Sequence, residues 1–134
     1  MVHYLSVSSR VRSEMIDITG PVRELLRKSG ITRGLCHLFV LHTTAGLTIN
    51  EGADPAVQRD MVSFLNRLVP QDHYFTHAEG NSDAHIKSSL MGSSLTVPVE
   101  EGKLILGTWQ AIYFCEFDGP RERRVTVKVV SDPA

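Results

Sequence analysis

One segment near the C-terminus, residues 109–117, constrains the fold more than any other part of the sequence. Successive side chains of a β-strand point to opposite faces of its sheet, and this segment carries large side chains at both sets of positions. The side chains on one face are Trp109, Tyr113 and Phe117, and those on the other are Ile112 and Phe114. A strand of this kind needs cover on both sides, which predicts a central strand in a layered domain.

The rest of the chain alternates strand-like and helix-like segments, with no linker, repeat or low-complexity tract. Asp54 and Pro55 are typical of the first positions of a helix, and apolar residues follow them at helical spacing until a proline. Two further helices are predicted over residues 17–29 and 83–91. The predicted strands are residues 2–9, 35–42, 47–49, 94–99, 103–107, 109–117 and 123–130. We therefore expect a single α+β domain over residues 1–134, in which an antiparallel or mixed sheet packs against two main helices.

The composition excludes several classes of function. The 14 Lys and Arg residues are balanced by 15 Asp and Glu residues, giving a net charge of -1, whereas a protein that binds duplex nucleic acid normally carries a basic excess. No apolar run is long enough to cross a bilayer, and the first ten residues lack the pattern of a signal peptide. Cys36 and Cys115 lie in apolar, strand-like segments and are expected to be buried thiols. We expect a cytoplasmic protein without a nucleic-acid or membrane partner.

Histidines gather around one polar loop and at the end of a predicted strand. His77 and His85 bracket a loop with carboxylate and amide side chains, and neutral imidazole is the commonest metal ligand in proteins. His42 ends an apolar strand, and a third imidazole from there would complete a three-histidine metal site with an open position. The alternative is a solvated polar loop that happens to contain histidines. The histidines left out of the candidate set are His3, His37 and His73.

Three other groups of residues have both a functional and a structural interpretation. Glu116 lies within the predicted central strand, and it needs a partner if its face of the sheet is buried. The charged turn over residues 121–124 would either bind phosphate or be solvated, and the serines around Gly92 would either donate to phosphate or cap helices. No nucleophile elbow, P-loop, dinucleotide fingerprint or paired-cysteine motif is present. Classical hydrolases and nucleotide-driven enzymes are therefore not supported.

Four groups of motifs occur in a characteristic order along nearly the whole chain. They are His42-Thr43-Thr44-Ala45-Gly46-Leu47-Thr48-Ile49-Asn50-Glu51 with Asp54-Pro55; His77 and Glu79-Gly80-Asn81-Ser82-Asp83-Ala84-His85-Ile86-Lys87; Met91-Gly92-Ser93-Ser94, Val97-Pro98-Val99, Gly102 and Gly107-Thr108-Trp109-Gln110; and Glu116-Phe117-Asp118-Gly119-Pro120-Arg121. Together they resemble the YjbQ-like family, which is often labelled secondary thiamine-phosphate synthase. The resemblance implies a compact α+β fold with a β-sandwich-like core. It also implies a homotrimer with a pocket close to the subunit interfaces.

The resemblance also implies a set of site residues. The family's motif histidines fall on His42, His77 and His85, which would be ligands of a divalent metal. Zinc is the expected metal, with magnesium possible alongside a diphosphate substrate. The acidic members of the motifs, which would orient a ligand or transfer a proton, are Glu51, Asp83 and Glu116. The residues expected to bind substrate or phosphate are Thr43, Ser93, Gln110 and Arg121.

The family label implies a transferase that couples a hydroxymethylpyrimidine diphosphate to a thiazole phosphate and releases diphosphate. We therefore expect a metal-binding enzyme that acts on a small phosphorylated metabolite, with thiamine-phosphate synthesis as a secondary activity. Two other interpretations stay open. One is a metal-dependent hydrolase, because an open three-histidine zinc site lowers the pKa of its bound water to about 7. The other is a non-catalytic trimeric module that binds a metal or another ligand.

Overall fold

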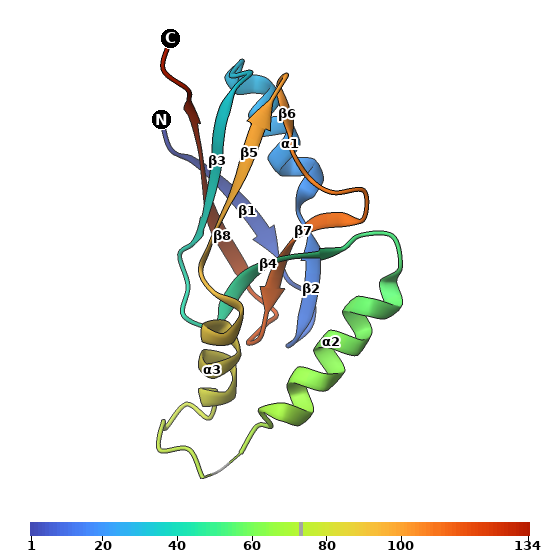
Figure 1. The fold of residues 1–134 in the computed structure, drawn as a ribbon. Coiled ribbons are helices and arrows are strands. Elements are labelled where there is room, and N and C mark those ends of the chain that lie inside the picture. Colours follow the sequence, from blue (N-terminus) through green and yellow to red (C-terminus); the bar gives the residue numbers. More distant parts are fainter. Residues whose placement is uncertain (73) are drawn as a thin grey trace.

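The computed structural model describes residues 1–72 and 74–134, which form three helices and two antiparallel sheets (Figure 1). The larger sheet has the strand order β1 (His3–Ser8), β8 (Glu122–Ser131), β3 (Gly34–Val40), β5 (Ser94–Glu100) and β6 (Lys103–Leu104). The smaller sheet has the order β2 (Glu14–Asp17), β7 (Gln110–Glu116) and β4 (Ala45–Glu51). The helices are α1 (Thr19–Ser29), α2 (Pro55–Leu68) and α3 (Ser82–Met91). The predicted α+β class is confirmed, and within the described residues the paired strands are antiparallel rather than mixed.

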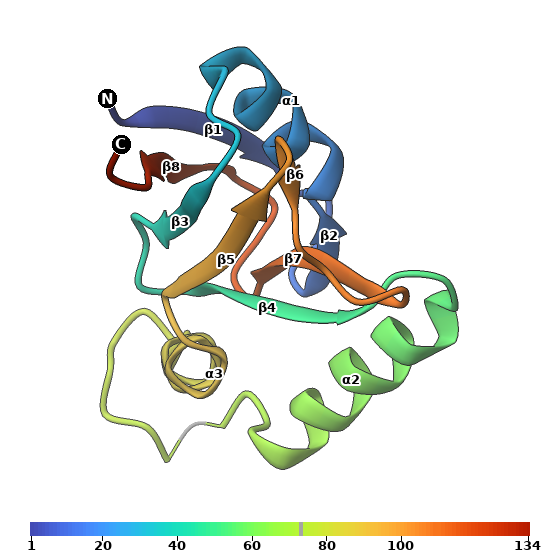
Figure 2. The same cartoon turned by 45° about the horizontal axis from the view of Figure 1, so that its top comes forward.

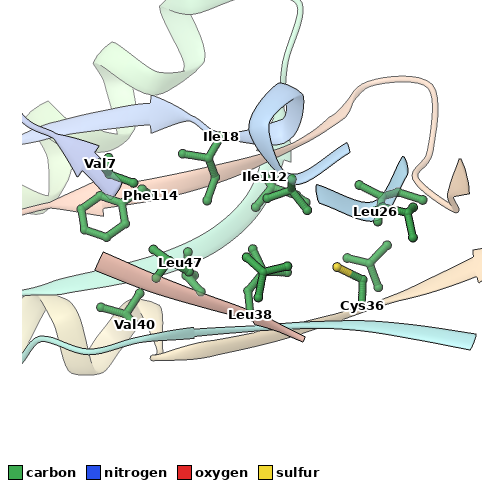
Figure 3. Close-up of a cluster of buried hydrophobic side chains, with 14 of the residues drawn as sticks. Val7, Ile18, Leu26, Cys36, Leu38, Val40, Leu47, Ile112 and Phe114 are labelled. Atoms are coloured by element: carbon green, nitrogen blue, oxygen red, sulfur yellow. The ribbon is translucent and has the colours of Figure 1, made fainter. Parts of the chain in front are cut away.

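The main hydrophobic core lies between the two sheets (Figure 3). Side chains of β3 alternate between buried and exposed, so that Leu38 points inward with no exposed surface while its neighbours in the strand face out. From the smaller sheet, Leu47, Ile112 and Phe114 meet it and are also fully buried. Helix α1 closes one end of this core with Val22 and Leu26, as expected for an amphipathic helix.

The predicted central strand is β7, which pairs with β2 on one side and β4 on the other. Its second face packs in a smaller cluster, in which Tyr113, Cys115 and Phe117 contact Ala84 of α3 and several partly buried side chains. Trp109 lies outside the strand and is 64% exposed, so its predicted place on the packed face is wrong. Both cysteines are buried as expected, and burial raises the pKa of Cys36 to about 11 and that of Cys115 to about 12.

The helix predicted after Asp54 is α2, and its start has the expected chemistry. The Asp54 side chain accepts the Ala56 N–H at 2.9 Å, and Pro55 occupies the first turn. The helix lies at the periphery of the molecule (Figures 1 and 2). Its apolar stripe is only partly covered, with Phe64 and Leu68 more than half exposed. No helix in the described part of the chain has both the length and the apolar character needed to cross a membrane.

Three local features differ from the sequence-based expectation. The strand predicted over residues 103–107 is β6, which ends at Leu104. The short strand β2 was not predicted, because four residues are too few to show a clear alternation. Helix α1 begins at Thr19 rather than near residue 17, because Asp17 forms the last position of β2 and its carboxylate accepts the Thr19 N–H at 2.9 Å. The predicted helix over 83–91 is α3, which stands against β4.

The contact between α3 and β4 leads to a stability prediction. A Cβ at Gly46 of β4 would lie 2.8 Å from the Gly92 carbonyl oxygen and 3.0 Å from Met91 Cβ. Gly46→Ala should therefore lower the free energy of unfolding by about 1–3 kcal/mol, since the backbone of α3 must move away. Gly20→Ala is the control, because a Cβ there meets nothing within 4 Å and alanine favours the helix. Urea unfolding of the three proteins measures both effects, and equal stability of Gly46→Ala and the wild type would contradict this packing.

Candidate functional site

The three histidines of the predicted metal site, which belong to two of the motifs, line one cavity of about 390 Å³. His42 follows the end of β3, His77 lies in the loop that precedes α3, and His85 lies within α3. The turn between β7 and β8 and the start of β8 supply the remaining wall, including Asp118 and Arg121. We call this cavity the histidine pocket. It joins segments that are far apart in the sequence at one end of the two-sheet core.

The three imidazoles differ in their surroundings. The rings of His77 and His85 pack edge to face, with centroids 5.4 Å apart and planes at 86°. His77 Nε2 lies 3.9 Å from a carboxylate oxygen of Glu79. His42 Nε2 accepts the backbone N–H of Arg124 at 2.8 Å. A neutral imidazole has one donor and one acceptor nitrogen, so this bond places the proton of His42 on Nδ1.

The charge state of His42 follows from its position. Burial lowers the pKa of His42, and the positive charge of Arg123 lowers it further. The ring is therefore neutral at physiological pH. A neutral ring keeps a lone pair, which is the form of histidine that binds a metal.

Arg123 lines the histidine pocket and forms a buried ion pair with Glu116 behind it. Glu116 accepts from Arg123 Nε at 2.9 Å, from Ser9 Oγ at 2.6 Å and from the backbone N–H groups of Phe117 and Asp118. Burial by itself raises the pKa of Glu116, but these hydrogen bonds outweigh burial and lower the pKa below its ordinary value. The sequence left the burial of Glu116 open. The structure shows the buried alternative, with the partners that a buried carboxylate needs.

A second network ties the loop before α3 to the β7–β8 turn. Asp118 Oδ2 accepts from Asn81 Nδ2 at 2.7 Å and from Arg121 Nη2 at 2.8 Å. These contacts orient the Asn81 amide, because its nitrogen must face the carboxylate. Among the described residues, Asn81 Oδ1 is then left buried and without a hydrogen-bond partner. Arg121 and Arg123, which line the pocket, are thus each paired with a carboxylate, whereas this one buried acceptor has no partner in the described part of the chain.

A neighbouring cavity of about 490 Å³ shares His42, Thr43 and His85 with the histidine pocket. Its other side chains include Ser93, which was predicted to bind substrate, and Ser88 and Ser89 from α3. The hydroxyls of Ser88 and Ser89 donate to carbonyl oxygens one turn earlier in the helix. Of the predicted substrate-binding residues, Thr43, Ser93 and Arg121 thus lie around the histidines.

Three predicted site residues lie elsewhere in the structure. Gln110 Oε1 accepts the Gly107 N–H at 2.7 Å, and Glu51 Oε2 accepts the Ala53 N–H at 2.7 Å, so both side chains organise their own loops. Asp83 is fully buried and lies on another side of α3 from His85. Two positions along a helix correspond to a rotation of about 200°, so the two side chains point in different directions. The three carboxylates predicted to act together are therefore apart, and Glu116 alone is near the histidine pocket.

Several residues that line the pocket were not predicted individually from the sequence. Among them are Glu79, Asn81, Asp118 and Arg123. A signal for Arg123 was present, because it shares the parity of Val125 and Val127 in its strand and must point toward the core with them. The roles of Asn81 and Asp118 depend on a contact between distant segments, which no local pattern reveals.

The described geometry bears on the predicted metal site. In residues 1–72 and 74–134, no group of three His, Cys, Asp or Glu side chains is compact enough to hold a metal ion.

A wider cavity of about 760 Å³ lies between α2 and the β2 edge and contains none of the predicted site residues. His73 lies outside the described residues, while His37 contacts Thr96 on an exposed sheet face.

An α+β protein with two antiparallel sheets and a histidine-lined pocket has close relatives among known proteins. A model of the family described as UPF0047 protein YjbQ-like matches residues 3–132. A UPF0047 protein of Methanocaldococcus jannaschii is 48% identical over 132 residues, covering 98% of this chain and 96% of that protein. The UPF0047 protein YugU of Bacillus subtilis is 50% identical over 131 residues, covering 97% and 99%. The chain therefore belongs to the YjbQ-like family.

Solved structures share the fold over the full length. A YjbQ/UPF0047 family protein of Clostridium acetobutylicum is 50% identical, with a TM-score of 0.93 over 96% of this chain and 99% of that one. A hypothetical protein of Aeropyrum pernix is 36% identical, with a TM-score of 0.94 over 98% and 99%. The fold that the resemblance implied is confirmed by these similarities.

The ion pair beneath the pocket gives a prediction for stability and its pH dependence. Glu116→Gln leaves the Arg123 charge buried without a counter-charge and should lower the free energy of unfolding by about 3–5 kcal/mol at pH 7. Because the pKa of Glu116 is lowered, this contribution is fully present above the carboxyl's unfolded-state pKa of about 4.3. It is lost as the pH falls through the lower folded-state pKa.

Denaturant unfolding at pH 7 and at lower pH measures this difference. The difference in the free energy of unfolding between the wild type and Glu116→Gln should become smaller at acidic pH. Glu24→Gln, which breaks the exposed pair with Arg27, is the control and should leave the free energy of unfolding nearly unchanged, because solvent screens an exposed pair. Equal effects of the two substitutions at pH 7 would contradict the structural role of the buried pair.

Proposed function

We propose that the chain is a metal-binding enzyme that acts on a small phosphorylated metabolite, with the histidine pocket as its active site. The observation that carries the proposal is the presence of His42, His77 and His85 around one cavity, although His42 lies far from the other two in the sequence. Ligand pockets of a few hundred Å³ with a small number of convergent polar groups are the usual form of small-molecule sites. The family membership is compatible with the proposal and leaves the reaction open.

The charge of the pocket supports a bound cation. Arg121 pairs with Asp118 and Arg123 pairs with Glu116, so neither guanidinium carries an uncompensated charge. A phosphate needs more positive charge than these two paired arginines supply by themselves. Neutral His42, the carboxylate of Glu79 and Asn81 Oδ1, which has no partner among the described residues, are all lone-pair donors, and such groups favour a cation. We therefore propose that metal and phosphate bind together.

The donor set fits zinc, which prefers imidazole ligands and keeps an open position in catalytic sites. The fit has two conditions. The three imidazoles must move closer together, because no group of three such side chains in the described residues is compact enough to hold a metal ion. The His42 lone pair already accepts the Arg124 N–H, so this ring must also release that hydrogen bond before it binds a metal. When bound, the metal would supply positive charge to a phosphate or lower the pKa of a bound water.

The chain's own residues have separate tasks under this proposal. Arg121 is half exposed and presents its guanidinium at the rim, where it can contact a phosphate oxygen while Asp118 orients it. Thr43 and Ser93 provide hydroxyls beside the histidines. Arg123 donates to Thr44 Oγ1 at 2.9 Å and thereby fixes the segment that carries His42. Glu116 acts through Arg123 and is a positioning residue.

Thiamine-phosphate synthesis is the specific reaction that we propose within this class. The cavity beside the histidine pocket adds room for a second reactant, and the coupling of a diphosphate to a thiazole phosphate requires two substrates in one site. Magnesium replaces zinc in this proposal if the diphosphate itself supplies oxygen ligands.

We also propose the homotrimer that the resemblance implies. Its support is the outer face of the larger sheet, where Leu35 and Phe39 of β3 are 48% and 41% exposed. Exposed apolar side chains at alternate positions of a central strand are typical of a covered interface.

The metal assignment predicts how much zinc the purified protein contains. Untagged wild type should hold about one zinc per chain, and the variants His42→Ala, His77→Ala and His85→Ala should each lose most of it, since three imidazoles share the ion. His3→Ala is the matched control, because His3 lies in β1 and lines neither of the two cavities around the histidines. Elemental mass spectrometry measures the zinc, and zinc retained in all three pocket variants would contradict the assignment.

The same preparations distinguish the possible reactions. Release of diphosphate only when both the pyrimidine diphosphate and the thiazole phosphate are present supports the synthase. Release from one substrate alone shows a hydrolase instead, and binding without turnover shows a non-catalytic module. Each outcome should depend on the metal that the pocket variants lose.

A further inference from the structure

A second cavity, of about 460 Å³, lies on the opposite side of α3 from the histidine pocket. Asp83 and Lys87 line it from α3, one turn apart on the same helix face. The loop between β1 and β2 contributes Arg12 and Ser13, and Asn66 comes from the end of α2. The cavity is therefore enclosed by three elements and shares none of its lining residues with the histidine pocket.

Its charges do not cancel. Asp83 is fully buried and its two oxygens accept from Arg12 Nη1 and Nη2, each at 3.0 Å. Lys87 is only 1% exposed, and its ammonium donates to the same carboxylate at 3.0 Å. Two cations thus share one anion of the cavity lining, and the other lining side chains are uncharged. The negative charge of Asp118 also acts on Arg12, but Asp118 is itself paired with Arg121. Arg12 is a third exposed, whereas Lys87 is buried, and an excess positive charge around a buried cation favours an anion.

The hydrogen-bond donors and acceptors of this cavity agree with its excess of positive charge. The Lys87 ammonium has three N–H groups, and its described acceptors are Asp83 and Asn66 Oδ1, at 2.8 Å for the latter. The Arg12 guanidinium has five N–H groups and uses two of them on Asp83. In contrast, both oxygens of Asp83 and the amide oxygen of Asn66 are occupied. The cavity therefore has spare donors and few spare acceptors, which is the reverse of the histidine pocket.

We infer that this cavity binds a small oxyanion, either a phosphate or a carboxylate group, between Arg12, Lys87 and Asn66. Arg12, Asp83 and Lys87 form a triad of two cations and one carboxylate. If this triad only held α3 to its neighbours, one cation would be enough for the one carboxylate. The second cation is the feature that a ligand explains. The volume is sufficient for a small metabolite that carries such a group. The inference does not require a metal or turnover, so it is independent of the proposed function.

Ser13 offers a test that leaves the triad in place. It is half-buried, lines the cavity and makes no hydrogen bond among the described residues. Ser13→Asp adds a carboxylate that neutralises the excess charge, and Ser13→Asn is the matched neutral control of the same shape. Both variants keep Arg12, Asp83 and Lys87, whose removal would leave a buried group unpaired.

The measurement is a titration of each protein with inorganic phosphate, and separately with acetate, followed by backbone amide NMR shifts. In the wild type, the amides of Ser13 and Lys87 should shift saturably with at least one of the two anions. Ser13→Asn should bind within a few-fold of wild type, and Ser13→Asp should bind about tenfold more weakly or not at all. The anion that saturates at lower concentration identifies the ligand class.

Three results would overturn the inference. The first is the absence of a saturable shift at these amides with either anion, and the second is equal binding by Ser13→Asp and Ser13→Asn. Shifts confined to Thr43 and Arg121 would place the anion in the histidine pocket instead, which also overturns it. None of these results affects the zinc content, so failure here is distinguishable from failure of the proposed function.

Discussion

The buried ion pair between Glu116 and Arg123 is the interaction on which the rest of the site depends. Glu116 belongs to the smaller sheet and Arg123 to the larger one, so the pair joins the two layers where their hydrophobic core ends. Ser9 and Thr44, which flank other strands, bind to the same two side chains. Removing either charge would leave the other buried without a partner, which costs far more than an exposed pair. The segment that carries His42 is therefore held by a polar cluster that the fold cannot easily lose.

Helix α3 separates two chemical environments. One of its faces presents His85 and serine hydroxyls to cavities whose arginines are already paired. Its other face presents Asp83 and Lys87 to a cavity with an excess of positive charge. A ten-residue helix can serve both because neighbouring residues point about 100° apart. The lone-pair donors on one side suit a cation, and the spare N–H donors on the other suit an anion, so the two cavities have complementary preferences.

The sequence was sufficient for the class of fold and for the elements with strong local signals. The start of α2 at Asp54 and Pro55, the buried alternation of β3 and the central position of β7 follow from local chemistry and periodicity. The meeting of His42, His77 and His85 followed from motif resemblance. In contrast, the places of Glu51, Asp83 and Gln110 depend on side-chain direction, and a motif does not determine the face on which its members lie. The charge balance of each cavity also required contacts between distant segments, such as Asn81 with Asp118.

The central claim is that the histidine pocket holds a divalent metal that allows a phosphorylated substrate to bind. Anomalous diffraction from crystals of the zinc-loaded protein, recorded on both sides of the zinc absorption edge, tests this claim most directly. The account predicts one strong anomalous peak per chain, within coordination distance of nitrogen atoms of His42, His77 and His85, with the Arg124 N–H released from His42. A zinc-loaded crystal with no peak in the pocket, or with zinc held only by surface side chains such as His37, would contradict it.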